Sequence, residues 1–165
     1  MNKKRLKLSR LELESLTSVL ALQFSREVAE MFMDMGSLLE VEKSSSTGRI
    51  RHVYLRDKLI GTIRAQDGMF IPTIEGARII LKKLKYPKKR VVVTDDAAPF
   101  IAMGKTLFCK HVKEVDPELR AGEEVFVVDS RDELLAVGKV ALSADEIKTK
   151  DRGRAAKIRK GVKEL

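Results

Sequence analysis

The sequence has few of the residues on which catalytic, redox and metal sites depend. It contains one cysteine, two histidines, no tryptophan and eight aromatic residues among 165. The single cysteine, Cys109, cannot form an internal disulfide, which is typical of a reducing compartment. With two histidines and one cysteine, an enzyme is also poorly supported. No GxSxG, GxGxxG, HExxH or CxxC motif occurs.

Long hydrophobic runs are missing as well. The longest stretch without a charged residue is 15–25, which is 11 residues, whereas a membrane-spanning helix needs about 20. The basic start resembles the first part of a signal peptide, but Glu12 and Glu14 interrupt the segment after it. We therefore expect a soluble cytoplasmic protein with no membrane partner.

Positive charge is what the sequence has in excess. There are 33 Lys and Arg against 24 Asp and Glu, a net charge of +9. This balance favours a polyanionic partner such as nucleic acid, although surplus lysine can also serve only solubility. The charge lies in blocks, since residues 1–90 carry +9, residues 91–147 carry −6 and residues 148–163 carry +7.

The first half is expected to combine helices with short strands. Ser9 and Glu12 are spaced as a capping box, and the apolar residues after them recur at helical intervals. A second amphipathic run ends at Gly36. Short strands come next, with a turn at Asp57-Lys58 and a type I′ hairpin turn at Asp67-Gly68.

A basic segment is expected to separate two domains. Thr73 is placed to cap a helix that ends before Tyr86-Pro87. Residues 82–90 then read KKLKYPKKR, with six positive charges, and are the best candidate for a linker. We predict an α/β domain over 1–88 and a second domain over 89–165.

The second half is expected to form a small barrel of mixed strands. Strands are expected at 91–93, 107–112, 125–128 and 134–142, with a helix from Asp95-Asp96 to Gly104. Ser143 and Glu146 form another capping box. Many short strands with one early helix favour this architecture.

Three suggestions of chemistry in this half do not hold. Gly104-Lys105-Thr106 resembles the end of a phosphate-binding loop. That loop requires a glycine five positions before Gly104, and the residue there is Pro99. Asp95 and Asp96 are better explained as helix caps than as an acid/base pair. Cys109 and His111 are expected on one face of a strand, spaced like two metal ligands, but zinc sites require three or four ligands and the only other histidine is His52. We therefore expect no enzyme activity, no cofactor and no metal.

The second half resembles a known family. The runs VVVTDDAAPFIAMGKTLFCKHVKEVDPELRAGEEVFVVD, LLAVGKVALSADEI and DRGRAAKI are similar to a PUA domain, the RNA-binding domain named for pseudouridine synthases and archaeosine transglycosylases. The resemblance covers about residues 91–160. It implies a pseudobarrel of mixed β-strands with a covering helix, and so an α+β fold for the whole chain.

The first half also carries a resemblance. The order of helices, strand meander, DG turn and the sequence PTI before a helix is similar to the pre-PUA domain of the malignant-T-cell-amplified-sequence proteins. Eukaryotic members of that family bind the small ribosomal subunit, and archaeal relatives are two-domain proteins of about this length. The match is good over residues 59–90 and only general over residues 1–45.

The PUA resemblance implies an RNA surface on the helix that begins near residue 97, the strand after it and the final strand. Gly104 lacks a Cβ, so a phosphate could approach its backbone closely, and basic residues near the end of the chain would release counterions from RNA. The expected RNA-binding residues are Ala98, Gly104, Lys105, Thr106, Lys110, Gly153, Arg154, Lys157, Arg159 and Lys160. The scarcity of aromatic side chains disfavours stacking on single strands, so a structured RNA is expected.

Two functions remain open on the sequence alone. The leading one is a non-enzymatic protein that binds tRNA or small-subunit ribosomal RNA in translation initiation or recycling, with the small ribosomal subunit or a translation factor as partner. The alternative is an accessory subunit that presents RNA to a modification enzyme. An independent RNA-modifying enzyme is disfavoured, because residues 1–90 are too short and too poor in catalytic motifs.

Overall fold

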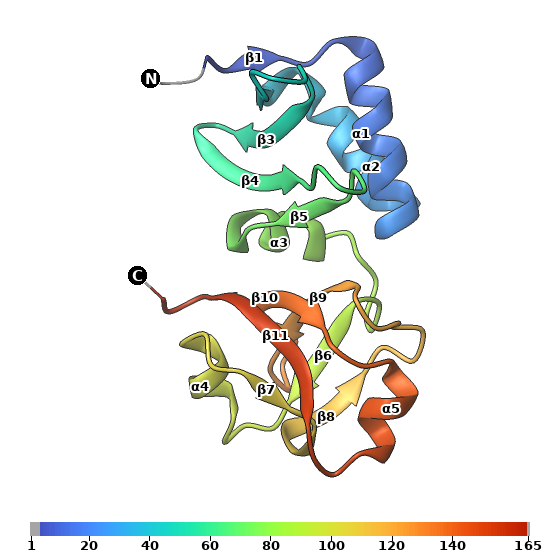
Figure 1. Ribbon diagram of the computed structural model, residues 1–165, viewed down its shortest axis with the longest axis vertical. Helices are drawn as coiled ribbons and strands as arrows, with labels where there is room; N and C mark the ends of the chain where they lie inside the picture. The colour runs from blue at the N-terminus through green and yellow to red at the C-terminus, as the bar shows by residue number, and fades with distance from the viewer. Residues whose placement is uncertain (1–3, 165) are drawn as a thin grey trace. The chain divides into compact units, whose positions relative to one another are not determined.

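The computed structural model describes residues 4–164, which divide into two compact units after Leu84. In the first unit, a five-stranded sheet has the order β1-β2-β3-β4-β5, with every neighbouring pair antiparallel. Its elements are β1 (Leu6–Lys7), α1 (Arg10–Gln23), α2 (Arg26–Asp34), the 3₁₀ turn η1 (Gly36–Leu38), β2 (Leu39–Lys43), β3 (Ile50–Leu55), β4 (Lys58–Ile63), β5 (Phe70–Pro72) and α3 (Ile74–Leu81). Helices α1 and α2 lie together beside the sheet (Figure 1).

The helices of this unit begin at polar caps. The predicted capping box is confirmed, because Ser9 Oγ accepts a hydrogen bond from the Glu12 amide at 3.1 Å and the Glu12 carboxylate accepts one from the Ser9 amide at 2.8 Å. Thr73 caps α3 as predicted. Phe32 and Phe70 are fully buried and meet edge to face, with their ring centroids 6.0 Å apart.

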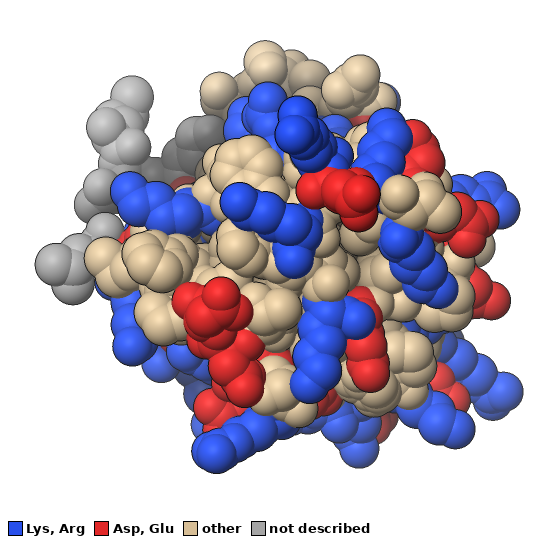
Figure 2. Space-filling view, turned by 90° about the horizontal axis from the view of Figure 1, so that it is seen from below, with Lys and Arg blue, Asp and Glu red and all other residues tan. Residues whose placement is uncertain are grey.

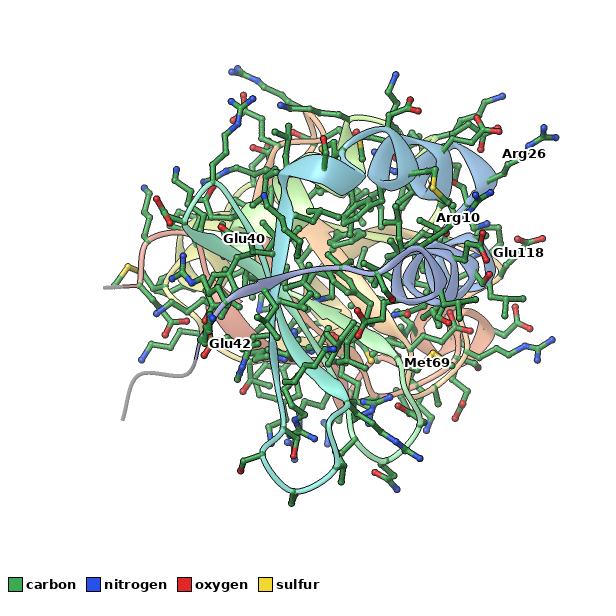
Figure 3. All side chains as sticks on the ribbon, turned by 90° about the horizontal axis from the view of Figure 1, so that it is seen from above. Arg10, Arg26, Glu40, Glu42, Met69 and Glu118 are labelled. Carbon is green, nitrogen blue, oxygen red and sulfur yellow. The ribbon has the colours of Figure 1, made fainter. Side chains whose placement is uncertain are left out.

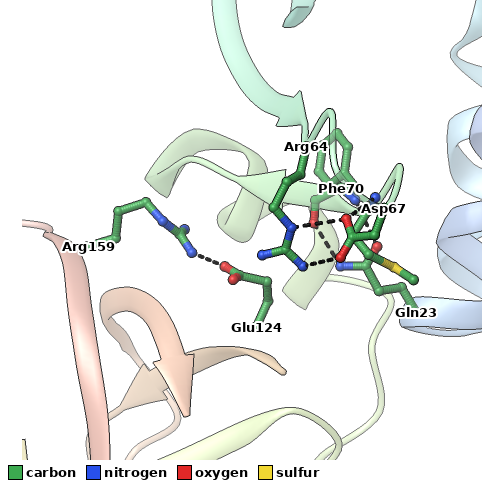
Figure 4. Close-up of polar contacts among 7 residues, drawn as sticks. Gln23, Arg64, Asp67, Phe70, Glu124 and Arg159 are labelled. Carbon is green, nitrogen blue, oxygen red and sulfur yellow. Dashed lines mark hydrogen bonds and ion pairs between the residues drawn. The ribbon is translucent and has the colours of Figure 1, made fainter. Parts of the chain in front are cut away.

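The edge strand β5 is held to α1 by one side chain. Gln23 Nε2 donates to the Phe70 carbonyl oxygen at 2.7 Å, and the Phe70 amide donates to Gln23 Oε1 at 2.9 Å (Figure 4). A glutamine amide matches the donor and acceptor pattern of a neighbouring strand. The contact therefore satisfies backbone groups that an edge strand otherwise exposes.

The turns of the sheet differ from the prediction. The tight turn between β3 and β4 is formed by Arg56 and Asp57, which both have positive φ, rather than by Asp57 and Lys58. Asp67-Gly68 does lie in a hairpin, but in a longer loop over 64–69 where only Gly68 has positive φ, so the type I′ prediction was wrong. Strands β1 and β2 were not predicted.

The second unit is a six-stranded sheet that curves into a nearly closed barrel. Its strand order is β7-β11-β10-β9-β6-β8, in which β6 and β9 are parallel and the other pairs antiparallel. The elements are β6 (Arg90–Val93), α4 (Ala98–Ala102), β7 (Leu107–Phe108), the 3₁₀ turn η2 (Cys109–His111), β8 (Val112–Val115), β9 (Glu124–Val128), β10 (Leu134–Val140), α5 (Ala144–Thr149) and β11 (Arg154–Gly161). The predicted α+β fold with a mixed pseudobarrel is confirmed.

Two local predictions in this unit were wrong. Residues 107–112 do not form one strand, because β7 and β8 stand at opposite ends of the strand order and η2 carries the chain between them. Helix α4 has Ala97 at its N-cap and no side-chain cap. Asp95 instead accepts a hydrogen bond from Ser130 Oγ at 2.8 Å. Cys109 and His111 consequently do not share a strand face.

The barrel encloses an aliphatic core. Val91, Val93, Leu107, Val127 and Ala136 are fully buried in it. Among residues 4–164, no helix combines the length and the apolar character that crossing a membrane requires.

Candidate nucleic-acid interface

A basic groove of about 580 Å³ lies on the second unit, along β10, β11 and the loop before β11. Among the described residues that line it, five are basic and none is acidic: Lys139, Lys150, Arg152, Arg154 and Lys157. Lys150 has a carboxylate partner, Glu146, at 3.6 Å. The other four form no ion pair with any described residue, so their charges are available to an anion.

The strand register forces two of these charges together. Lys139 on β10 is paired directly with Lys157 on β11. Like charges that face each other across a sheet repel. The two strands also approach closely here, since a Cβ on Gly138 would lie 2.3 Å from the Lys157 carbonyl oxygen. The strand register therefore holds two positive charges close together, and a bound phosphate would reduce the repulsion between them.

An irregularity in β11 places Arg154 and Lys157 on the same groove. The register between β11 and β7 shifts between Arg154 and Ala156, and both Ala155 and Ala156 are buried. Regular alternation would turn residues three apart to opposite faces. Because of the shift, Arg154 and Lys157 are both exposed and both line the groove.

Gly153 fixes the entry into β11. Its φ is +108°, a backbone conformation that side chains with a Cβ rarely adopt. Its carbonyl oxygen accepts a hydrogen bond from the Cys109 amide at 2.9 Å. Of the residues expected to bind RNA, Gly153, Arg154 and Lys157 are thus brought together, and sequence reasoning missed Lys139, Lys150 and Arg152 beside them.

Arg159 has a different environment. Its guanidinium forms an ion pair with Glu124, whose side chain is only 5% exposed (Figure 4). A buried carboxylate needs such a partner, so Arg159 is already engaged within the barrel. Lys160, also expected to bind RNA, is half-buried and paired with Val137. Neither residue lines the basic groove.

Four other expected residues lie in α4 or in the turn that follows it. Gly104 has a φ of +87° and comes after the helix, while Lys105 and Thr106 are exposed just before β7. Ala98 is the first residue of α4. Because β7 pairs with β11, this turn precedes a strand that runs beside the one carrying Arg154. None of these four residues lines the basic groove.

Lys110 belongs to a second cleft, of about 700 Å³, in the same unit. Its charged lining includes Lys113 and Lys148 but also Glu114, Asp116 and Asp151. The Tyr86 hydroxyl donates to the Glu114 carboxylate, and this hydrogen bond raises the pKa of the phenol. The mixed charge makes this cleft a weaker candidate for phosphates than the basic groove.

Basic side chains alone do not single out an interface. In Figure 2, Lys and Arg are spread across the visible face with acidic side chains between them. Within residues 4–164, moreover, no three His, Cys, Asp or Glu side chains are grouped to hold a metal ion. The basic groove is distinguished by charges of one sign, four of which have no ion-pair partner in the described part of the chain.

The two units match two family models. Residues 89–162 match the PUA domain, and residues 14–87 match the patch-forming domain C2 of tRNA-guanine transglycosylase. The fold and these matches define a protein with an RNA-binding PUA domain. In this chain a pre-PUA-like domain of the C2 type precedes the PUA domain, and the predicted resemblance to PUA-domain proteins is confirmed at this level.

Two curated relatives of this chain have the same name. The chain is 42% identical over 134 residues to a tRNA-guanine(15) transglycosylase of Methanothermobacter thermautotrophicus, and this match covers 78% of this chain and 20% of the relative. It is 51% identical over 106 residues to that of Korarchaeum cryptofilum, covering 64% of this chain and 18% of the relative. The chain therefore spans about a fifth of the length of these relatives.

Solved structures share the fold. A hypothetical protein of Pyrococcus horikoshii has a TM-score of 0.71 and 23% identity, covering 98% of this chain and 96% of that one. A conserved PUA domain protein of Thermoplasma acidophilum has a TM-score of 0.67 and 23% identity, covering 98% and 95%. Both share the fold of this chain over nearly their whole length.

Proposed function

We propose that this chain binds tRNA through the basic groove of its PUA domain and serves the guanine transglycosylation of that tRNA. The observation that carries the proposal is the set of four charges around one groove, on Lys139, Arg152, Arg154 and Lys157, that no described carboxylate neutralises. A groove of this kind suits the sugar–phosphate backbone of a structured RNA, which is recognised by shape and phosphate contacts.

The relatives support tRNA as the RNA and modification as the process. Their name includes tRNA and a guanine-exchange reaction, which favours the accessory role over the translation role that the sequence left open. About four-fifths of their length has no counterpart in these 165 residues. We infer that the exchange chemistry is performed by residues outside them, while this chain contributes binding.

Salt dependence and charge reversal test the binding. Four phosphate contacts predict a slope of log affinity against log salt of about −3.6, and so an approximately fiftyfold loss between 100 and 300 mM salt. Fluorescence anisotropy with an unmodified tRNA transcript measures this directly. A flat response to salt contradicts the proposal.

Matched variants locate the interface. Lys139→Glu and Lys157→Glu should each weaken binding much more than Arg131→Glu, which makes the same charge change on an exposed loop of the same domain. Arg26→Glu provides a control on the first unit, where Arg26 points away from α2 and pairs with Glu30 (Figure 3). Equal losses in all four variants would mean that only net charge matters.

The process is tested by reconstitution. Adding this chain to the catalytic part of a tRNA-guanine(15) transglycosylase should increase guanine exchange at limiting tRNA. Co-sedimentation with small ribosomal subunits, without any effect on exchange, would favour the translation role instead.

A further inference from the structure

A carboxylate covers the glycine at the end of α4. A Cβ built on Gly104 would lie 1.9 Å from Glu164 Oε1, so this oxygen rests directly against the glycine backbone. The same oxygen accepts a hydrogen bond from the Gly161 amide at 2.7 Å. The Lys163 amide donates to the Ala102 carbonyl oxygen at 2.9 Å, which holds the segment after β11 along α4.

The surroundings of Glu164 offer little stabilisation to its negative charge. Glu164 is half-buried and forms no ion pair with any described residue. The backbone groups that end a helix are carbonyl oxygens, which disfavour a neighbouring negative charge. Its one hydrogen-bond donor among the described residues is a backbone amide. Lys105, the residue after Gly104, is exposed and likewise has no carboxylate partner among residues 4–164.

A carboxylate and a phosphate present similar oxygens with the same sign of charge. The site under Glu164 has a glycine that allows close approach, a free amide donor once the carboxylate leaves, and a lysine next to it. We propose that Glu164 occupies the place of an RNA phosphate at the Gly104 turn and is displaced when RNA binds. This inference rests on the proposed function and adds to it that the Glu164 carboxylate competes with RNA for the Gly104 turn.

The Glu164 carboxylate should lower the affinity of the chain for tRNA by a measurable factor. Glu164→Gln keeps the size of the side chain and an oxygen that can accept from Gly161, but it removes the charge. Removing one negative charge about 5 Å from a bound phosphate should raise affinity about three- to tenfold at low salt. Glu118→Gln is the matched control, because Glu118 is an exposed glutamate on the loop between β8 and β9 of the same domain, with no ion pair among the described residues.

The experiment compares tRNA binding by the wild-type chain, Glu164→Gln and Glu118→Gln at 50 and 300 mM salt. Amide NMR spectra of the wild type with and without tRNA provide a second readout. We expect tighter binding by Glu164→Gln alone, and a large shift of the Gly161 amide signal when tRNA displaces its carboxylate partner.

The outcomes separate the inference from the proposed function. Binding by Glu164→Gln within twofold of Glu118→Gln, or a Gly161 amide signal that saturating tRNA leaves unchanged, overturns the inference and leaves the proposed function intact. Absence of tRNA binding by all three proteins refutes the proposed function, and the inference with it.

Discussion

Replacing Lys157 by glutamine should stabilise the PUA domain while weakening its binding of tRNA. The substitution removes one of two like charges that face each other across β10 and β11. Two unit charges about 7 Å apart in water repel by about 0.6 kcal/mol. We therefore expect a gain of about 0.5 kcal/mol in the free energy of unfolding, or about 2–4 °C in the melting temperature of a domain this size.

The salt dependence should distinguish the loss of Lys139–Lys157 repulsion from other causes of a change in stability. The side chains of Lys139 and Lys157 are both exposed, and the Debye length falls from about 10 Å at 0.1 M salt to about 3 Å at 1 M. The stabilisation should therefore be largest at 20 mM salt and nearly absent at 1 M, as thermal unfolding followed by circular dichroism will measure. In tRNA titrations, the slope of log affinity against log salt should become shallower by about 0.9, the value for one lost phosphate contact.

A double substitution completes the test. Lys139→Gln alone should stabilise the domain by a similar amount, and the double variant should gain little beyond either single change, because no repulsion remains after the first. Arg131→Gln should change neither stability nor the salt slope. Loss of stability in Lys157→Gln at low salt, or an unchanged salt slope, would refute the reasoning from the Lys139–Lys157 pair.

Other parts of the structure support three more predictions. Arg159→Ala leaves the buried Glu124 carboxylate without its partner and should cost about 3 kcal/mol in chemical denaturation, whereas a double variant that also carries Glu124→Gln should recover much of the loss. Gly138→Ala places a Cβ 2.3 Å from a carbonyl oxygen of β11 and should cost about 2–3 kcal/mol, measured the same way. Arg64 binds the Asp67 carboxylate and lowers its pKa to about 2. This contact therefore stabilises the fold above pH 4, and the stabilisation is lost as the pH falls through about 2. An NMR titration should show the pKa of Asp67 rising toward its usual value in Arg64→Gln.

Local signals in the sequence were sufficient wherever a short segment determines its own structure. The capping boxes at Ser9 and Ser143 begin helices as predicted, because the side chain and the amide that it caps are three residues apart. The buried strand at 125–128 was also recognisable from its apolar run. The turn at Arg56-Asp57 was missed by one residue, because φ at a turn depends on the register of the strands beside it.

The sequence itself indicated a PUA domain, and three of the residues that it predicted to bind RNA, Gly153, Arg154 and Lys157, line one groove in the structure. Its charge blocks indicated an anionic partner, and its motifs indicated a PUA domain. Lys139 could not be found in this way, because it lies in a stretch with a net negative charge and joins the groove only through its pairing with Lys157. Nor could the sequence indicate that Arg159 is engaged by Glu124, 35 residues away, or that Glu164 returns to cover Gly104. The amino-acid sequence determined which charges and turns the chain possesses. Strand register and the irregularity in β11 between Arg154 and Ala156 decided which of those charges face the same groove, since one residue of shift turns a side chain to the other face of a sheet.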